Sequence, residues 1–212
     1  MPNWCNNNIT ISGDEGTIRT LTAVLKNLKT DDNEQSNNVF QSLIGLPQHM
    51  SDGDYKEKWY DTNIEWFGTK WDISYSEDMF TFTKGEISFF CETAWSPPIP
   101  FLQNLCEMYK VNANLFYSEG GVGFSGESTF NWVDGELEVY DDECGYLEGI
   151  YKYSREEFWS EVESRVDSIL DEEQTLEDFI SEFDFVSEED KEELTRLYNE
   201  TINNNDEESE GE

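Results

Sequence analysis

The sequence predicts an α+β fold, in which an antiparallel sheet carries helices on one face and an acidic helical module follows it. Two runs of strand-forming residues, 79–83 and 86–91, meet at Lys84-Gly85 and indicate a β-hairpin. A helical pattern lies on each side of this hairpin, with an alternating segment beyond each helix. This order of strand, helix, hairpin, helix and strand is that of a split βαβ sandwich. From residue 154 onwards the apolar residues recur at helical spacing.

The elements before the hairpin follow from the same periodicities. Residues 3–12 end in an alternation of apolar and polar side chains, which predicts the first strand. Residues 18–28 carry apolar side chains at helical spacing and predict an amphipathic helix of about 13 residues. Residues 39–46 are apolar up to Pro47 and are interpreted as a short helix or strand. The polar residues 48–63 are expected to form a loop.

Two tryptophan-containing motifs flank the hairpin. They are Trp66-Phe67-Gly68-Thr69-Lys70-Trp71-Asp72 before it and Thr93-Ala94-Trp95-Ser96-Pro97-Pro98 after it. Their glycine and prolines restrict the backbone to tight paths. Pro98 and Pro100 then open a helix that continues to Tyr109, because a first turn tolerates the missing N–H of proline.

Further strands are predicted after this helix. Residues 111–117 alternate as a strand, and residues 128–133 and 136–140 form a hairpin around Asp134-Gly135, a dipeptide that favours two-residue turns. Residues 146–153 are interpreted as a further strand.

Helix signals dominate the remainder of the chain. Ser154 and Glu157 form a capping box ahead of an apolar stripe that ends at Leu170. Thr175 and Ser187 open a second and a third helix.

The change of period and the charge divide the chain. We expect an α+β domain at residues 1–153, an acidic helical module at residues 154–202 and a disordered acidic tail at residues 203–212. The net charge is −35, from 48 acidic and 13 basic residues. Residues 151–212 hold 23 of the acidic and 5 of the basic residues, so the negative charge is densest in the helical module.

The net charge and the cysteines limit which partners and which cellular compartment we expect for this protein. A chain this acidic repels phosphate backbones, so we expect no direct nucleic-acid binding and favour a protein partner with a basic surface. A role in solubility or in a high-salt habitat is the alternative. Cys5, Cys91, Cys106 and Cys144 form no Cys-x-x-Cys pair, which indicates free thiols in a reducing cytoplasm. No secretory signal and no apolar run of about 20 residues is present, so we expect a cytoplasmic protein without membrane contact, metal or cofactor.

Several motifs occur in order within roughly the first 130 residues. They are Met1-Pro2-Asn3-Trp4-Cys5-Asn6, Gly68-Thr69-Lys70-Trp71-Asp72, Thr93-Ala94-Trp95-Ser96-Pro97-Pro98 and the segment 117–126. Together they resemble the YubB/Api92-like family of phage and mobile-element proteins. The resemblance implies a ferredoxin-like domain and a viral or plasmid-borne gene, and it implies no activity. The acidic helices after residue 154 lie outside these motifs, so we expect the feature particular to this chain to lie there.

Three patterns are interpreted as structural rather than catalytic. Gly121-Val122-Gly123-Phe124-Ser125-Gly126 matches a dinucleotide-binding fingerprint, but a strand-like segment follows where that site needs a helix, so glycine bulges in a bent sheet are favoured. His49 is the only histidine and lies in an expected loop, which argues against a catalytic triad. Asp141-Asp142-Glu143 lacks EF-hand spacing and is interpreted as a solvated loop.

A ligand pocket in the first domain is one candidate site. Lys70 is a rare cation in this chain and could contact a ligand anion in a cleft near Trp71 and Trp95. An ion pair with Asp72 or a cation–π contact with a tryptophan is the structural alternative. The tryptophans themselves are expected to be core residues.

The acidic helices form the leading candidate site. Glu163, Asp167 and Asp171 recur every four residues and stand in one row, although like charges at this spacing cost ~0.2–0.5 kcal/mol per pair. Each step rises ~6 Å, against ~3.4 Å per phosphate along a DNA strand, so one row mimics at best every second phosphate. A second acidic face is therefore needed, and its candidates are Glu157, Glu161, Glu188, Glu189, Glu192 and Glu193. An ordinary exposed helix face is the alternative.

From these features we expect a phage-type, non-enzymatic interaction protein. Its acidic module would occupy the basic groove of a host nucleic-acid-binding protein, a defence or replication factor, and would compete with the natural polyanion. A small-ligand or enzymatic site near Lys70, Trp71 and Trp95 is one alternative, and self-assembly as a homodimer or structural protein is another.

Overall fold

The computed structural model describes residues 2–28, 38–170 and 175–209, with the backbone alone at 165–170 and 202–209. The chain divides into two units, residues 1–143 and residues 144–212, which we call unit 1 and unit 2. This division comes earlier than the boundary predicted after residue 153.

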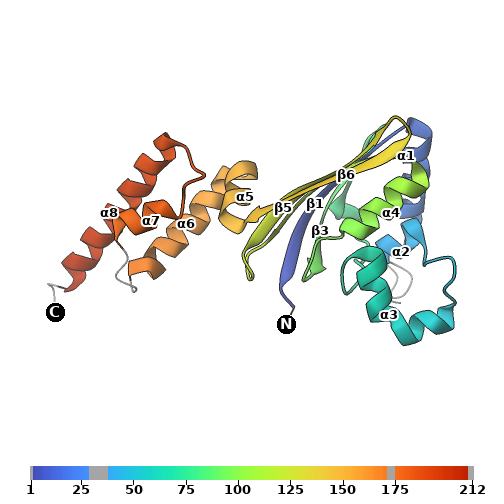
Figure 1. The fold of residues 1–212 in the computed structure, drawn as a ribbon, viewed down its shortest axis with the longest axis horizontal. Helices are drawn as coiled ribbons and strands as arrows, with labels where there is room; N and C mark the ends of the chain where they lie inside the picture. The colour runs from blue at the N-terminus through green and yellow to red at the C-terminus, as the bar shows by residue number, and fades with distance from the viewer. Residues whose placement is uncertain (1, 29–37, 171–174, 210–212) are drawn as a thin grey trace. The chain divides into compact units, whose positions relative to one another are not determined.

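An antiparallel sheet forms the centre of unit 1 (Figure 1). Among the described residues it has six strands, in the order β2-β3-β1-β4-β5-β6. They are β1 (Trp4–Ser12), β2 (Phe80–Phe82), β3 (Glu86–Ala94), β4 (Asn112–Glu119), β5 (Phe124–Val133) and β6 (Glu136–Gly145). The predicted α+β class, an antiparallel sheet with ferredoxin-like order, is confirmed. Asp141-Asp142-Glu143, expected in a loop, instead belongs to β6.

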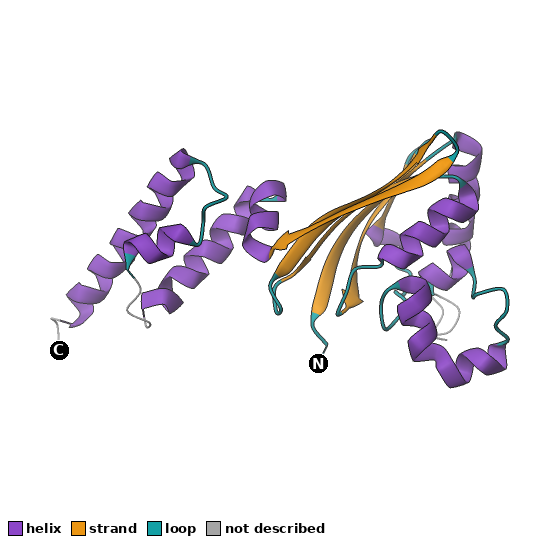
Figure 2. Cartoon of the chain, viewed as in Figure 1, coloured by secondary structure: helices purple, strands orange, loops and turns teal. Residues whose placement is uncertain are grey.

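The helices of unit 1 gather on one side of the sheet (Figure 2). They are α1 (Glu15–Asn27), α2 (Val39–Ile44), α3 (Asp52–Phe67) and α4 (Ile99–Tyr109), with a short 3₁₀ turn, η1 (Glu77–Met79). Apolar residues of β1, β3 and β4 alternate towards these helices, so one face of each strand is buried in the core. The other face carries mostly polar side chains, with the exposed Trp4 and Phe90 among the exceptions. Ile9, Leu21 and Leu105 are among the fully buried members of this core.

Strand β1 is the central member of the sheet. It pairs antiparallel with β3 from Trp4 opposite Ala94 to Ser12 opposite Glu86, and with β4 from Asn6 to Ser12. The residues of β1 from Asn6 to Ser12 therefore pair with both neighbours, and Trp4 and Cys5 pair with β3 alone.

The prediction of a loop at residues 48–63 is wrong, because α3 occupies most of this segment. Ser51 and Asp54 form a capping box at the start of α3, and Gly68 ends the helix with φ 84°. Helical periodicity does not predict this helix, because it has almost no apolar stripe and Phe67 is its only buried apolar residue. Residues 39–46, left open between helix and strand, begin with the helix α2.

Two glycines mark tight places in the sheet. Asp134 and Gly135 both have positive φ, as a type I′ hairpin turn requires, which confirms the predicted β5–β6 turn. Gly126 lies opposite Tyr117 on β4, and a Cβ there would lie 2.4 Å from Tyr117 Oη. The hydroxyl of Tyr117 lies where a side chain at position 126 would lie, and it donates a hydrogen bond to Asp141 at 3.1 Å.

Unit 2 is helical throughout its regular elements. They are α5 (Tyr146–Tyr153), α6 (Arg155–Leu170), α7 (Leu176–Ser181) and α8 (Glu188–Ser209). The strand predicted at residues 146–153 is wrong, because α5 stands there and buries Ile150 in the core of unit 2. That core also contains Phe158, Phe179 and Leu194, so each helix contributes to it.

The disordered tail predicted from residue 203 begins inside a helix. Helix α8 continues to Ser209, and only residues 210–212 of the predicted tail lie outside the described part of the chain.

We expect Gly126→Ala to lower the free energy of unfolding of unit 1 by about 1–3 kcal/mol, which is the cost of overpacking a filled site. The new methyl group would collide with Tyr117 Oη and, at 2.7 Å, with the backbone oxygen of Asp142. Urea unfolding, followed through hydrogen exchange of the β4 and β5 amides, measures the effect.

Gly53→Ala is the matched control for this substitution. A Cβ at Gly53 comes no nearer than 3.7 Å to Ser51 Oγ, and alanine is the better helix former in the first turn of α3. Its stability should equal or exceed that of the parent protein. An equal loss of stability in both variants would contradict the packing described for Gly126.

Candidate functional site

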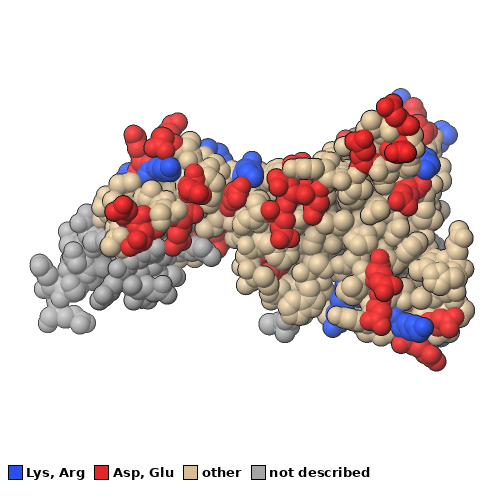
Figure 3. Space-filling model, viewed as in Figure 1, with Lys and Arg blue, Asp and Glu red and all other residues tan. Residues whose placement is uncertain are grey.

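The negative charge is concentrated in unit 2. Its 69 residues hold 24 acidic and 5 basic residues, a net charge of −19 out of −35 for the chain. On the face drawn in Figure 3, acidic side chains cover more of the surface than basic ones do on both units. The candidate site must therefore be distinguished from a generally acidic surface.

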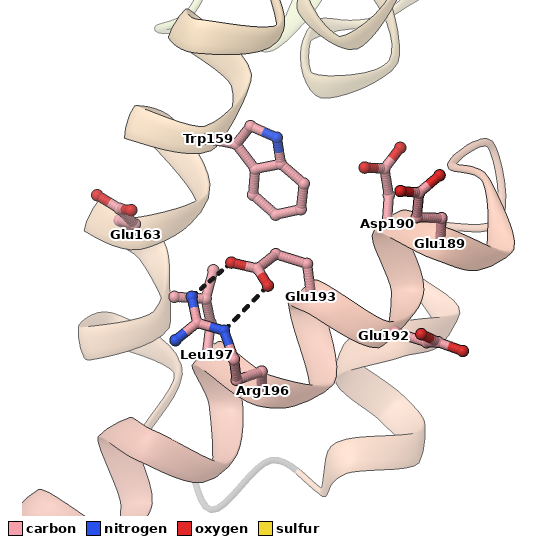
Figure 4. Close-up of a pocket in the computed structure, with 8 residues that line it drawn as sticks. All are labelled: Trp159, Glu163, Glu189, Asp190, Glu192, Glu193, Arg196 and Leu197. Carbon is pink, nitrogen blue, oxygen red and sulfur yellow. Dashed lines mark hydrogen bonds and ion pairs between the residues drawn. The ribbon is translucent and has the colours of Figure 1, made fainter.

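A groove between α6 and α8 gathers carboxylates in unit 2 (Figure 4). It has a volume of about 660 Å³. Its lining residues are Trp159, Glu163, Glu189, Asp190, Glu192, Glu193, Arg196 and Leu197. Trp159 and Glu163 come from α6 and the others from α8, so four of the predicted partner-binding residues meet around one concave surface. We call this surface the acidic groove.

Arg196 neutralises part of the acidic groove from within. Its guanidinium donates to Glu193 and, one turn further along α8, to both oxygens of Glu200 at 2.7 Å. Figure 4 shows the two contacts with Glu193 as dashed lines. The hydrogen bonds from Arg196 lower the pKa of Glu193, so this carboxylate is already paired.

Asp190 is the structural carboxylate of the acidic groove. It is nearly fully buried and accepts hydrogen bonds from Tyr151 Oη, Ser187 Oγ and the guanidinium of Arg155. Burial raises its pKa, but the hydrogen bonds from Tyr151, Ser187 and Arg155 outweigh burial and leave the pKa below its ordinary value. Asp190 thus joins α5, α6 and α8 and is committed to the fold.

Three carboxylates remain at the groove for another molecule. Glu163, Glu189 and Glu192 are exposed and make no ion pair with any described residue of the chain. Trp159 is half-buried against Phe158, and its indole N–H has no acceptor within the described residues. The acidic groove therefore offers three uncompensated negative charges beside an aromatic ring.

The other predicted partner-binding residues do not form one row with these. Glu157 lies exposed in the first turn of α6, and Glu161 is half-buried. Glu188 pairs with Lys191 at 2.9 Å. The side chain of Asp167 and the whole of Asp171 lie outside the described residues, so the predicted row is described only at Glu163.

The ligand pocket predicted for unit 1 is partly assembled. Lys70 Nζ lies 4.4 Å from the ring centroid of Trp71, which is the cation–π contact weighed as the structural alternative. Trp71 also lines two cavities, of about 830 Å³ and about 300 Å³. Neither Lys70 nor Trp95 lines either of them.

The expectation that the tryptophans are core residues is wrong for most of those in unit 1. Trp66 donates its indole N–H to Gly45 O at 3.0 Å, and Trp132 donates to Cys106 O at 3.1 Å. Trp4, Trp59, Trp71 and Trp95 are 37–48% exposed, and none donates its indole N–H to a described residue.

Three of these exposed tryptophans lie at one corner of the sheet. The rings of Trp4 and Trp71 have centroids 6.1 Å apart, and Trp95 follows Ala94, the β-sheet partner of Trp4. We call Trp4, Trp71 and Trp95 the tryptophan corner. Sequence reasoning missed Trp4, because strand pairing places it opposite Ala94 and the hydrogen bond from Thr69 Oγ1 to Ala94 O holds the segment before Trp71 at the same place.

Trp95 has a strained backbone with φ 75°, which is unusual for a bulky side chain. Neighbouring hydrogen bonds hold it there, including Trp95 N–H to Asn3 O at 3.0 Å and Ser96 Oγ to Gly68 O at 2.6 Å. Since the indole is half exposed, core packing does not account for a tryptophan at this position.

Asp72 lies between the two cavities beside Trp71. Its carboxylate accepts from the backbone N–H groups of Phe40 and Gln41, both at 2.8 Å, and so caps α2. Burial raises the pKa of Asp72 to about 6, against the opposing effect of these hydrogen bonds. The ion pair considered between Lys70 and Asp72 is not formed among the described contacts.

The glycine fingerprint and His49 lie outside the three cavities described above. The glycine fingerprint spans the β4–β5 turn and enters β5, so the helix that a dinucleotide site requires does not follow. His49 is exposed ahead of α3. Within the described residues, no group of three or more potential ligands is placed to hold a metal ion. In the same part of the chain, no helix is both long enough and apolar enough to cross a membrane.

We expect unit 2 to lose stability as the pH falls below about 4 because of Asp190. Its pKa is lowered in the folded state, so its contribution is complete above the unfolded pKa and disappears as the pH falls through the folded pKa. Asp190→Asn should lower the melting temperature of unit 2 at neutral pH and flatten this acid dependence. Thermal unfolding by circular dichroism at several pH values measures both.

Asp184→Asn serves as the comparison, because Asp184 is exposed and carries the same charge. General repulsion among carboxylates relaxes equally in both variants, so their difference isolates Asp190. Equal melting temperatures of the two variants at neutral pH would contradict the structural role assigned to Asp190.

Comparison with known proteins identifies the family. A family model described as the ferredoxin-like domain in Api92-like protein matches residues 70–199. The match therefore reaches through the acidic helices to α8, which corrects the expectation that the resemblance stops near residue 130. No curated protein matches the chain.

One solved structure is similar to part of the chain. It is the protein Api92 from Yersinia pseudotuberculosis, at 10% sequence identity and a TM-score of 0.36, with 69% of this chain and 98% of that chain covered. The family match itself spans more than half of the 212 residues. The chain therefore belongs to the Api92-like proteins.

Proposed function

We propose that this protein is a phage-type, non-enzymatic interaction protein that binds a basic surface of a host protein through unit 2. The partner is a nucleic-acid-binding protein of defence or replication, and the carboxylates compete with its natural polyanion. The observation that carries the proposal is the acidic groove, where Glu163, Glu189 and Glu192 stand without a cationic partner among the described residues.

The negative charge and the aromatic ring of the acidic groove favour a cationic side chain as its ligand. Figure 4 shows Glu163 on α6 and Glu189 and Glu192 on α8, at opposite sides of the groove, so different lysines or arginines of one basic surface would meet these three uncompensated carboxylates, with the ring of Trp159 between the two sides. The internal pairs made by Arg196 and Arg155 hold α8 and leave these carboxylates in place. Binding would therefore need little rearrangement of the helices.

The overall charge supports the encounter rather than the specificity. A net charge of −19 on unit 2 attracts a basic protein over roughly a Debye length, about 8–10 Å at physiological salt. Contacts inside the groove then decide whether the encounter becomes a complex.

The proposal is tested with a triple variant, Glu163→Gln, Glu189→Gln and Glu192→Gln. Affinity capture from host lysate at low and high salt, with added double-stranded DNA as competitor, identifies partners and shows whether they are nucleic-acid-binding. We expect the parent protein to bind them at low salt, and we expect the triple variant to bind the purified partner at least about tenfold more weakly.

The matched control changes three exposed carboxylates of unit 2 that do not line the groove: Glu156→Gln, Glu177→Gln and Asp184→Asn. It alters the net charge by the same amount and should keep nearly all of the affinity. If both variants lose affinity equally, general charge and not the groove is responsible. If binding is the same at low and high salt, competition by carboxylates is the wrong mechanism.

A further inference from the structure

The smaller cavity beside the tryptophan corner has a different lining from the acidic groove. Its volume is about 300 Å³, and it lies in unit 1. The rings of Trp4 and Trp71 and the side chain of Met79 supply polarisable apolar surface, and Glu92 and Asp72 supply carboxylates. Its lining residues include no lysine or arginine. We call it the corner cavity.

Strand geometry explains why the corner cavity exists. Strand β2 pairs only with residues 87–89 of β3, so the second half of β3 has no strand beside it on that edge among the described residues. Residues 71–74 line the cavity together with β3 residues 91–94 and Trp4 of β1. The gap beside the short strand is thus walled by indole rings rather than filled by another strand.

The charges of the corner cavity exclude some ligand classes. Glu92 is exposed and negative, so an anion would be repelled. A divalent metal ion needs several free oxygen ligands, but Asp72 already accepts from the backbone N–H groups of Phe40, Gln41 and Ile73. Burial raises the pKa of the Cys91 thiol, so this lining residue is a neutral thiol and no nucleophile.

The remaining chemistry favours an organic cation. Indole rings attract cations through their faces, and they do so best when the cation is weakly hydrated and brings apolar groups of its own. The thioether of Met79 accommodates alkyl groups, and Glu92 supplies the counter-charge. Trp71 already accepts an ammonium in this protein, because Lys70 Nζ lies 4.4 Å from its ring centroid.

We propose that the corner cavity is a binding site for an alkylated ammonium group, held against the indole rings of Trp4 and Trp71 with Glu92 as its counter-ion. Such a group occurs on small molecules of the choline type and on methylated lysine side chains. The site is independent of the acidic groove, since the two are lined by residues of different units.

The test is a titration of the full chain with choline, followed through the indole N–H signals in ¹H–¹⁵N NMR spectra. We expect the signals of Trp4 and Trp71 to shift, while those of Trp66 and Trp132, which are bonded to backbone carbonyls, stay in place. The neutral isostere 3,3-dimethylbutan-1-ol has the same shape without the charge. It should bind at least about fivefold more weakly than choline.

Two substitutions examine the ring and the charge separately. Trp71→Leu keeps an apolar wall without an indole face and should weaken choline binding about fivefold or more. Glu92→Gln should weaken choline binding and leave the binding of the isostere unchanged. The controls are Phe90→Leu and Glu86→Gln, which lie on β3, the strand of Glu92, but outside the cavity, and choline binding by these variants should stay within about twofold of the parent. Unchanged signals of Trp66 and Trp132 verify that each variant is folded.

The outcomes separate the proposal from its rivals. Equal binding of choline and its isostere would overturn it in favour of a merely apolar pocket, and no shift of Trp4 or Trp71 at any choline concentration tested would also overturn it. A second titration uses a short peptide with one trimethyllysine and its unmodified counterpart. Tighter binding of the trimethylated peptide than of choline supports the proposal with a protein as the source, and equal or weaker binding supports it with a free small molecule.

Discussion

The pairing of β1 with β3 is the interaction on which the site in unit 1 depends. It places Trp4 opposite Ala94, and the N–H of Trp95 donates to Asn3 O. Asn7 fixes this register from inside, because its buried amide donates to Cys5 O, Cys91 O and Thr93 Oγ1 at 2.7–3.2 Å. A slip by one residue would leave that amide unpaired and turn every side chain of β1 to the other face. The sheet register therefore places Trp4 beside Trp95, and the hydrogen bond from Thr69 Oγ1 to Ala94 O holds the segment before Trp71 at the same corner.

Charge acts differently in the two proposed sites. In unit 2, the ion pair of Arg155 with Asp190 links α6 to α8, and Arg196 pairs with Glu193 within α8. The acidic-groove carboxylates that remain unpaired are exposed. Such exposed charges contribute little to stability, typically 0–1 kcal/mol per pair, but they govern encounter with a partner. In unit 1 the corner cavity needs only one exposed carboxylate, Glu92, because the indole faces supply the rest of the attraction for a cation.

Periodicity predicted most of the elements, and its failures have physical causes. β1 and α1 were predicted because alternation and helical spacing accompany burial on one face. Helix α3 was missed because its stability rests on caps, Ser51 and Gly68, rather than on an apolar stripe. The ion pairs of Lys191 with Glu188 and of Arg196 with Glu193 could be predicted from their three-residue spacing in a helix. They neutralise two of the carboxylates that were predicted to bind a partner. The nearness of Trp4 to Trp71 could not be predicted, since it depends both on the register of β1 with β3 and on the hydrogen bond from Thr69 Oγ1 to Ala94 O.

Exchange of the indole N–H protons with water tests most directly whether the sheet register holds the tryptophan corner at the surface. The rates for all seven tryptophans are measurable on the full chain by NMR. Trp4, Trp71 and Trp95 should exchange rapidly, while Trp66 and Trp132, bonded to Gly45 O and Cys106 O, should be slower by on the order of tenfold or more. Protection of Trp4 and Trp71 equal to that of Trp66 would contradict the account, because it would place these rings in the core.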